Sequence, residues 1–239
     1  MGTTTLFVRF GECDLRCRWC DSPHTWRPAA SCRIEVARGS GERREVPNPV
    51  ALDEVLAAAE ALELAEHRFV SLTGGEPLLQ PEAVAALAAA LRARGPRILL
   101  ETHGLAAEAL ASVVEHVDVV SMDWKLASDV RRASDPSRGP VQPFHAEHAR
   151  FLRVARRAPE VVVKMVVTPA SGDEELAQAW RAVAEIDPGI PVILQPVTPF
   201  GGVRERPSAA RLLELARRAS RTLRDVRVIP QTHPVLGAP

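Results

Sequence analysis

The stretch Cys13-Asp14-Leu15-Arg16-Cys17-Arg18-Trp19-Cys20 holds three of the four cysteines in the chain, in the spacing C-x3-C-x2-C. Three thiolates this close together on a loop can bind three irons of a [4Fe–4S] cluster and leave the fourth iron open, whereas ordinary clusters of this kind take four cysteines. A structural zinc site or three bystander thiols are the alternatives. Zinc prefers four N/S ligands with a second pair further along, and Cys32 has no such neighbour. The spacing therefore favours the iron–sulfur cluster.

The composition outside this stretch is that of an ordinary globular chain. Its 239 residues are enough for one domain with a substantial core. Lys+Arg and Asp+Glu both total 30, so no excess charge indicates nucleic acid or a membrane surface as a partner. We find no long apolar span and no signal-peptide pattern, and clustered cysteines are not a disulfide framework. We therefore expect a cytoplasmic protein.

Apolar segments rich in Val, Ile and Leu alternate with amphipathic segments along the chain. We expect strands at 3–10, 68–73, 97–101, 118–123, 160–167, 191–197 and 225–229, and helices at 53–66, 81–94, 106–114, 144–157, 173–186 and 207–223. This alternation predicts an α/β fold with a parallel sheet that is covered by helices and curled into a partial barrel. We expect one domain over 1–239, in which 27–49 form a loop or small excursion and a further loop runs up to Pro143.

A second motif, Thr73-Gly74-Gly75-Glu76-Pro77, ends an apolar run and leads into a helix. Together and in this order, the cysteine triad and this GGEP motif resemble the radical S-adenosylmethionine (SAM) enzymes. The resemblance implies a partial (βα)6 barrel, whose six core units are too few for a complete eight-fold barrel. It also implies that the open iron is chelated by the amino and carboxylate groups of SAM's methionine moiety. Gly74, Gly75 and Glu76 would then hold that amino group.

Polar residues follow the predicted strands at their carboxyl ends, where ligands bind in parallel βα folds. Each could also be an ordinary helix cap or turn residue. Ser121, Asp123 and Lys125 alternate, so they share one face if the strand continues that far, and we interpret them as SAM contacts. Lys164 lies among valines and needs a partner or a function. His103 could be a helix cap or part of the site. The histidines that fall on predicted helices or their edges are expected to be solvated: His67, His116, His145 and His148.

Further motifs narrow the family. They are Phe7-Val8-Arg9-Phe10, Asp21-Ser22, Glu101-Thr102-His103-Gly104, Leu194-Gln195-Pro196-Val197 and Pro230-Gln231-Thr232-His233. In this order they resemble the 7-carboxy-7-deazaguanine synthases, lyases of queuosine and deazapurine biosynthesis, from Thr5 to the C-terminus. The resemblance implies conversion of 6-carboxy-5,6,7,8-tetrahydropterin to 7-carboxy-7-deazaguanine with loss of ammonia. The cofactor carries the radical, so we assign no catalytic side chain.

The same resemblance implies the rest of the site and its partners. It adds Trp19, Asp21 and Gln195 to the SAM contacts and makes Ser22 a ligand of Mg²⁺. The implied substrate contacts are Arg9, Thr73, Gln231, His233 and the terminal carboxylate of Pro239. An electron donor such as flavodoxin or ferredoxin and a homodimer are further expectations, with no nucleic acid or membrane as partner.

The chain departs from the family pattern at two positions. Members usually begin with a strand that ends in Gln-Gly-Glu-Gly, and this motif does not precede Gly2, so we expect the true start to lie upstream of Met1. His103 also stands where the family more usually has Asn.

Two other functions remain open from the sequence. A radical SAM activating enzyme that installs a glycyl radical on a partner protein would share the cysteine triad. A non-catalytic iron–sulfur or zinc-binding module would need neither the GGEP motif nor the βα framework.

Overall fold

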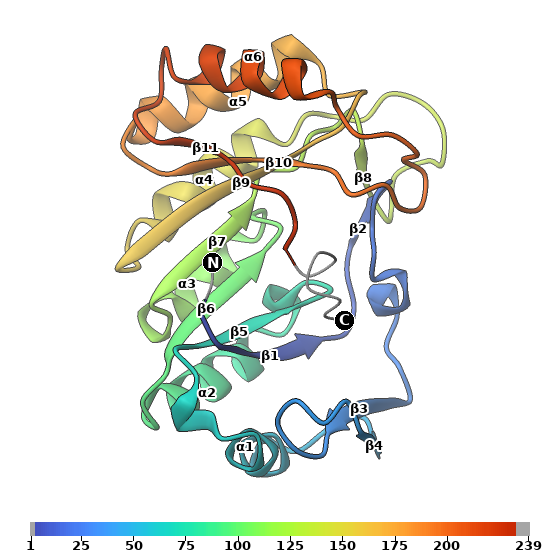
Figure 1. Ribbon diagram of the computed structural model, residues 1–239, viewed down its shortest axis with the longest axis vertical. Helices are drawn as coiled ribbons and strands as arrows, with labels where there is room; N and C mark the ends of the chain where they lie inside the picture. Colours follow the sequence, from blue (N-terminus) through green and yellow to red (C-terminus); the bar gives the residue numbers. More distant parts are fainter. Residues whose placement is uncertain (1–2, 233–239) are drawn as a thin grey trace.

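A computed structural model describes residues 3–232, and its centre is a parallel sheet of seven strands (Figure 1). All neighbouring strands run parallel, and each pairs with the next βα unit along the chain. This arrangement confirms the predicted α/β fold. In sheet order the strands are β1 (Thr5–Phe10), β5 (Phe69–Gly74), β6 (Arg97–Thr102), β7 (Val119–Asp123), β9 (Glu160–Val167), β10 (Val192–Pro196) and β11 (Val226–Val228).

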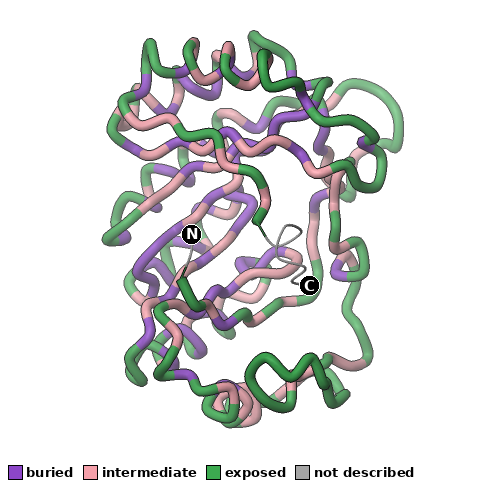
Figure 2. Tube along the Cα trace, viewed as in Figure 1, coloured by how far each residue is buried: buried purple, intermediate pink, exposed green. Residues whose placement is uncertain are grey.

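Six α-helices within the described residues connect the strands and cover the outer face of the curved sheet (Figure 1). The buried hydrophobic core lies between these helices and the sheet, and Val70, Leu100 and Val120 have no exposed surface there. Figure 2 shows this burial along the strands, in contrast to exposed loops. The helices are α1 (Leu52–Ala61), α2 (Pro81–Arg92), α3 (Ala107–Val113), α4 (His145–Ala155), α5 (Asp173–Ile186) and α6 (Ala209–Ala219), and short 3₁₀ turns are η1 (Pro23–Trp26), η2 (Leu64–Glu66), η3 (Pro77–Leu79) and η4 (Val114–His116).

The predicted and observed elements differ mainly at helix ends. The expected helix over 53–66 stops at Ala61, because Glu63 has a left-handed backbone (φ 59°) and a separate 3₁₀ turn follows. The expected helix over 207–223 begins only at Ala209, because the hydroxyl of Ser208 accepts from the backbone N–H of Arg211 and caps the helix there.

Two short antiparallel sheets lie outside the main sheet. Strand β2 (Leu15–Cys17) pairs with β8 (Val130–Arg132), which lies in the segment that we expected to be loop up to Pro143. Strands β3 (Ser31–Glu35) and β4 (Arg43–Pro47) form a hairpin, so the small excursion at 27–49 has regular structure. The β2–β8 pair matters for the site because it holds the cysteine stretch against a segment in the middle of the chain.

The inner face of the main sheet is polar toward the carboxyl ends of its strands. Residues in register on parallel strands point to the same face. Arg9 is in register with Thr73, and Asp123 with Lys164, so polar side chains from four strands face the same side. Within residues 3–232, no helix has the length and apolar character needed to cross a bilayer.

Candidate active site

The cysteine loop, residues 13–20, follows β1 at the carboxyl edge of the sheet. Cys13, Cys17 and Cys20 are unpaired and partly buried. Burial, with smaller contributions from the nearby Cys20 and Cys13, raises the pKa of Cys17 to about 11, while Lys125 opposes the rise. Burial also raises the pKa of Cys13. Three adjacent thiols without a disulfide suit a metal cluster, which binds as the thiols lose their protons.

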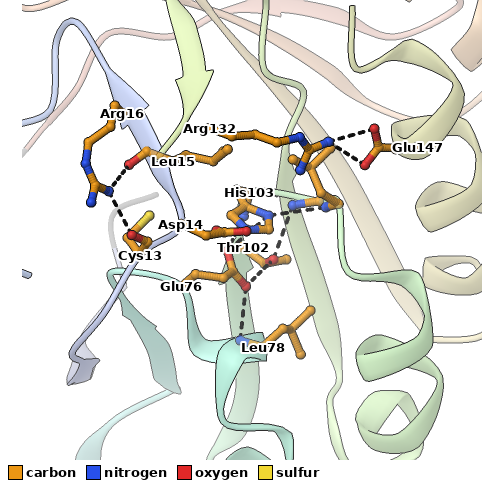
Figure 3. Close-up of polar contacts among 12 residues, drawn as sticks. Cys13, Asp14, Leu15, Arg16, Glu76, Leu78, Thr102, His103, Arg132 and Glu147 are labelled. Carbon is orange, nitrogen blue, oxygen red and sulfur yellow. Dashed lines mark hydrogen bonds and ion pairs between the residues drawn. The ribbon is translucent and has the colours of Figure 1, made fainter. Parts of the chain in front are cut away.

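Arg16 folds the cysteine loop back on itself. Its guanidinium donates to the carbonyl oxygens of Cys13 and Leu15, both at 2.8 Å (Figure 3). It also lies 4.7 Å from the ring centroid of Trp26. The loop conformation is therefore stabilised by the protein's own residues. Cys32 lies elsewhere, on β3 of the hairpin.

The GGEP loop, residues 74–77, packs directly against the segment that leads into Cys13. The backbone N–H groups of Gly75 and Glu76 donate to the carbonyls of Phe10 and Glu12, at 2.9 and 2.8 Å. Gly74 has φ +120°, and a Cβ at Gly75 would lie 1.9 Å from the carbonyl oxygen of Glu12. Only glycine fits this close approach of two backbones. The two sequence motifs thus meet in space.

Glu76 is fully buried and its carboxylate is bound by the protein. It accepts from the backbone N–H of Leu78 at 3.0 Å, the hydroxyl of Thr102 at 2.7 Å and the backbone N–H of His103 at 2.7 Å (Figure 3). These bonds tie the GGEP loop to the end of β6. The carboxylate of Glu76 is thus bound within the protein, and the contact of this residue with SAM stays a prediction.

His103 connects the cysteine loop to the end of β6. Its Nε2 lies 2.9 Å from Asp14 Oδ1, and its Nδ1 accepts from the backbone N–H of Leu105 at 3.2 Å, so the donor to Asp14 is Nε2–H. Burial alone would raise the pKa of Asp14, but the hydrogen bond and charge of His103, with smaller contributions from Arg132 and the backbone, together lower that pKa. Helix α3 begins after Ala106, so His103 is not its cap.

Asp123 pairs with two lysines, of which Lys125 is buried and Lys164 half-buried. Its carboxylate oxygens lie 2.7 Å from Lys125 Nζ and 2.9 Å from Lys164 Nζ. Burial opposes ionisation of Asp123, yet the two lysines lower its pKa to about 2. Burial opposes the charge of both lysines as well, and Asp123 outweighs it and raises their pKa values; the nearby Cys17 adds to the effect at Lys125. The partner that Lys164 was expected to need is thus Asp123.

Glu101 and Ser71 also belong to this face. The hydroxyl of Ser71 donates to Glu101 Oε1 at 2.6 Å, and Glu101 lies in register with Ser121. Glu101 is one of the polar residues at the predicted strand ends, but the sequence indicates no role for it, and Ser71 was not predicted. The alternation of Glu101 with buried Leu100 and Thr102 is the signal that could have placed it on the inner face.

Two histidines of α4 are not solvated as expected. His148 is fully buried, accepts from the backbone N–H of Lys125 at 2.8 Å and donates from Nδ1 to the carbonyl of Gly104 at 2.8 Å. His145 is half-buried and accepts from Trp124 Nε1–H at 3.0 Å. That prediction was wrong because α4 turns both rings toward the strand ends, where backbone groups need partners.

We expect the metal-free chain to lose stability in acid through His148. Burial lowers the pKa of His148 to about 3, from 6.5. The unfolded chain takes up this proton first, so stability is complete above pH 6.5 and falls as the pH drops from there toward 3, by about 1.4 kcal/mol per pH unit. His148→Gln should remove this dependence. Urea unfolding between pH 4 and 7 measures it, and equal slopes in both proteins would contradict the assignment.

Several other predicted residues gather beyond Cys20. Ser22 Oγ donates to Asp21 Oδ1 at 3.0 Å, and Gln231 Nε2 lies 3.4 Å from Asp21 Oδ2, so the segment after β11 reaches the end of the cysteine loop. Trp19 packs against Val197 and neighbouring valines. Of the other predicted contacts, Arg9 is exposed, Thr73, Ser121 and Gln195 are half-buried, and His233 and Pro239 lie outside the described residues.

Comparison with known proteins identifies the family to which the chain is similar. The family model of the radical SAM superfamily matches residues 8–183. The 7-carboxy-7-deazaguanine synthase of Geobacter sulfurreducens is 37% identical over 245 residues, which cover 99% of this chain and 91% of that protein. The synthase of Methanopyrus kandleri is 36% identical over 239 residues, with 98% and 86% covered.

The fold also resembles a solved radical SAM structure. The crystal structure of Streptococcus suis SuiB bound to S-adenosylmethionine superimposes with a TM-score of 0.60 at 12% identity, over 96% of this chain and 50% of that one. This likeness concerns the fold alone. With the cysteine and GGEP motifs in contact and relatives matched over nearly their full length, the chain belongs to the radical SAM superfamily and, within it, to the 7-carboxy-7-deazaguanine synthase family.

Proposed function

We propose that this chain is a single-domain radical SAM lyase that converts 6-carboxy-5,6,7,8-tetrahydropterin to 7-carboxy-7-deazaguanine with loss of ammonia, in queuosine or deazapurine biosynthesis. The observation that carries the proposal is the packing of the GGEP loop against Phe10 and Glu12, which lead into the cysteine loop, beside a polar sheet face. Similarity to synthases over nearly the whole chain selects this reaction over glycyl-radical activation or simple metal binding.

Cys13, Cys17 and Cys20 would hold the [4Fe–4S] cluster, which supplies the electron for reductive cleavage of SAM. The backbone of Gly74 and Gly75 packs against Phe10 and Glu12, which lead into Cys13, and would offer carbonyl groups to the amino group of SAM. The ammonium of Lys125 faces the thiols and balances negative charge there. The remaining proposed SAM contacts are Trp19, Asp21, Ser121, Asp123 and Gln195.

The substrate would bind on the inner face of the sheet near its β1 edge. Arg9 is exposed there and in register with Thr73, so its guanidinium can form a bidentate pair with the substrate carboxylate. Thr73 and Gln231 can hydrogen-bond the pterin edge, and we assign His233 and the carboxylate of Pro239 to the same edge. The protein's part is to orient the pterin and exclude competing reactions.

We also propose a magnesium site at Ser22. Mg²⁺ prefers oxygen ligands and keeps several waters, so a hydroxyl and the substrate carboxylate form a suitable partial shell. Ser22 lies beside the carboxylate of Asp21, which adds negative charge at this point.

Three further proposals concern partners and compartment. SAM cleavage requires an electron, and flavodoxin or ferredoxin would supply it. The proposal of a homodimer rests on the family resemblance alone. The four free thiols of the described residues suit a reducing compartment, and we propose the cytoplasm.

Turnover by the anaerobically reconstituted protein tests these proposals together. With SAM, reductant, tetrahydropterin and Mg²⁺, we expect methionine, 5′-deoxyadenosine and 7-carboxy-7-deazaguanine by mass spectrometry. Ser22→Ala should keep the cluster and SAM cleavage but form product slowly at low Mg²⁺, while the exposed control Ser128→Ala should match wild type. Cleavage of SAM without conversion of the pterin at any Mg²⁺ concentration would contradict the proposed function.

A further inference from the structure

Arg18, which lies between two of the three clustered cysteines, is held by segments far along the chain. Its backbone N–H donates to the carbonyl of Asp129 at 3.0 Å, and its own carbonyl accepts from the N–H of Gly202 at 2.7 Å. Its guanidinium reaches Asp129 Oδ1 at 3.0 Å and the carbonyl of Gly202 at 3.2 Å. Both the backbone and the side chain of this residue are therefore fixed.

Asp129 holds Arg18 from the interior of the protein. The side chain of Asp129 has no exposed surface, and its second oxygen accepts from the hydroxyl of Thr168, just after β9. A buried carboxylate is costly unless it is paired and hydrogen-bonded. Among residues 3–232, Arg18 is the only cation in an ion pair with Asp129. Displacement of the cysteine loop would therefore leave a buried charge without its counterion.

The other side of the loop is held by close backbone packing. Gly201 has φ +58°, and a Cβ there would lie 2.8 Å from the carbonyl oxygen of Arg18. The N–H of Cys20 donates to the carbonyl of Cys17 at 3.2 Å, which closes the turn around Arg18. Asp129 on one side and Gly202 on the other thus hold the turn that presents two thiols.

We propose that Asp129, supported by Thr168, is a positioning residue for the iron–sulfur cluster. Through Arg18 it fixes the Cys17–Cys20 turn before iron binds, so that the two thiols are already in place. This inference rests on the cluster of the proposed function, but on no property of the pterin. All the residues involved belong to this chain. The effect on iron binding is therefore measurable without substrate.

Asp118 provides a matched control. It is also largely buried, its carboxylate lies 3.1 Å from Arg92 Nη2, and it accepts from the backbone N–H of Ile98 at 2.8 Å. It directly precedes β7, so it lies at the amino end of that strand, whereas the cysteine loop follows the carboxyl end of β1. Asp118→Asn and Asp129→Asn each remove one buried charge from an arginine pair, so they separate general destabilisation from an effect on the cluster.

The test compares reconstituted wild type, Asp129→Asn and Asp118→Asn. We measure the rate of iron loss to a chelator, the electron paramagnetic resonance spectrum of the reduced cluster, and the melting temperature of the metal-free chains. Residues that orient metal ligands typically change metal affinity about 10- to 100-fold. We expect iron loss from Asp129→Asn to accelerate by about that factor and its spectrum to broaden. Asp118→Asn should keep the wild-type rate and spectrum even if it melts earlier.

Two further variants keep the proposal falsifiable if Asp129→Asn does not fold. Thr168→Val removes only the supporting hydroxyl and should accelerate iron loss by about tenfold, the lower end of that range. The double variant Arg18→Gln, Thr168→Val should accelerate iron loss by less than the product of the two single accelerations, because both changes act through Asp129. Iron loss that merely follows melting temperature in every variant would overturn the proposal. If the cluster is intact but the pterin is not converted, the proposed function is contradicted and the inference about Asp129 is not.

Discussion

Replacement of any one of Cys13, Cys17 or Cys20 by alanine is expected to abolish the cluster, whereas Cys32→Ala should keep it. The three thiols lie close together beyond β1, and loss of one leaves two ligands for a site that already uses fewer than the usual four. Cys32 belongs to the β3–β4 hairpin. Iron and sulfide content per chain and the visible absorbance of the cluster measure the result.

The metal-free variants provide the control for these changes. Each thiol is only partly buried, so the alanine chains should still fold and show the circular dichroism of wild type. A full complement of iron in Cys17→Ala, or its loss in Cys32→Ala, would contradict the assignment of ligands.

Glu76→Ala should have the largest effect on stability. It removes the acceptor of three donors, from Leu78, Thr102 and His103, inside a fully buried site. Each unsatisfied buried donor costs about 1–3 kcal/mol, so we expect the free energy of unfolding to fall by roughly 3 kcal/mol or more. Urea unfolding of the metal-free chain measures this loss.

The same variant should also bind SAM weakly, because Glu76 ties the GGEP loop to the end of β6. Glu76→Gln keeps one acceptor oxygen and should lie between wild type and alanine in both measurements. Glu185→Gln, an exposed position on α5, should change neither. An alanine variant as stable as wild type would show that the buried carboxylate is dispensable.

The sheet was predictable because its strands and helices have strong periodic patterns. Strand β9 and helix α5 match the predicted 160–167 and 173–186 at both ends. The short strands β2 and β8 were not predictable, because three residues carry no periodicity and their pairing joins segments over a hundred residues apart.

The site was predictable in its motifs but not in its internal contacts. The spacing of Cys13, Cys17 and Cys20 and the glycines of the GGEP loop indicate chemistry by residue type alone. The roles of Asp129 and His148 depend on burial, which arises when distant elements pack. Nothing in the sequence around either residue distinguishes it from a solvated one, so these contacts required the fold.

The order of strands also bears on how the protein is made. Because each strand of the main sheet pairs with the next βα unit along the chain, the sheet can grow outward from β1 during synthesis. The cysteine loop emerges first, yet its contacts with Asp129 and Gly202 lie 111 and 184 residues further on. The thiols are therefore synthesised early and enclosed late. The contacts that fix the turn around Arg18 are therefore complete only after Gly202 has left the ribosome.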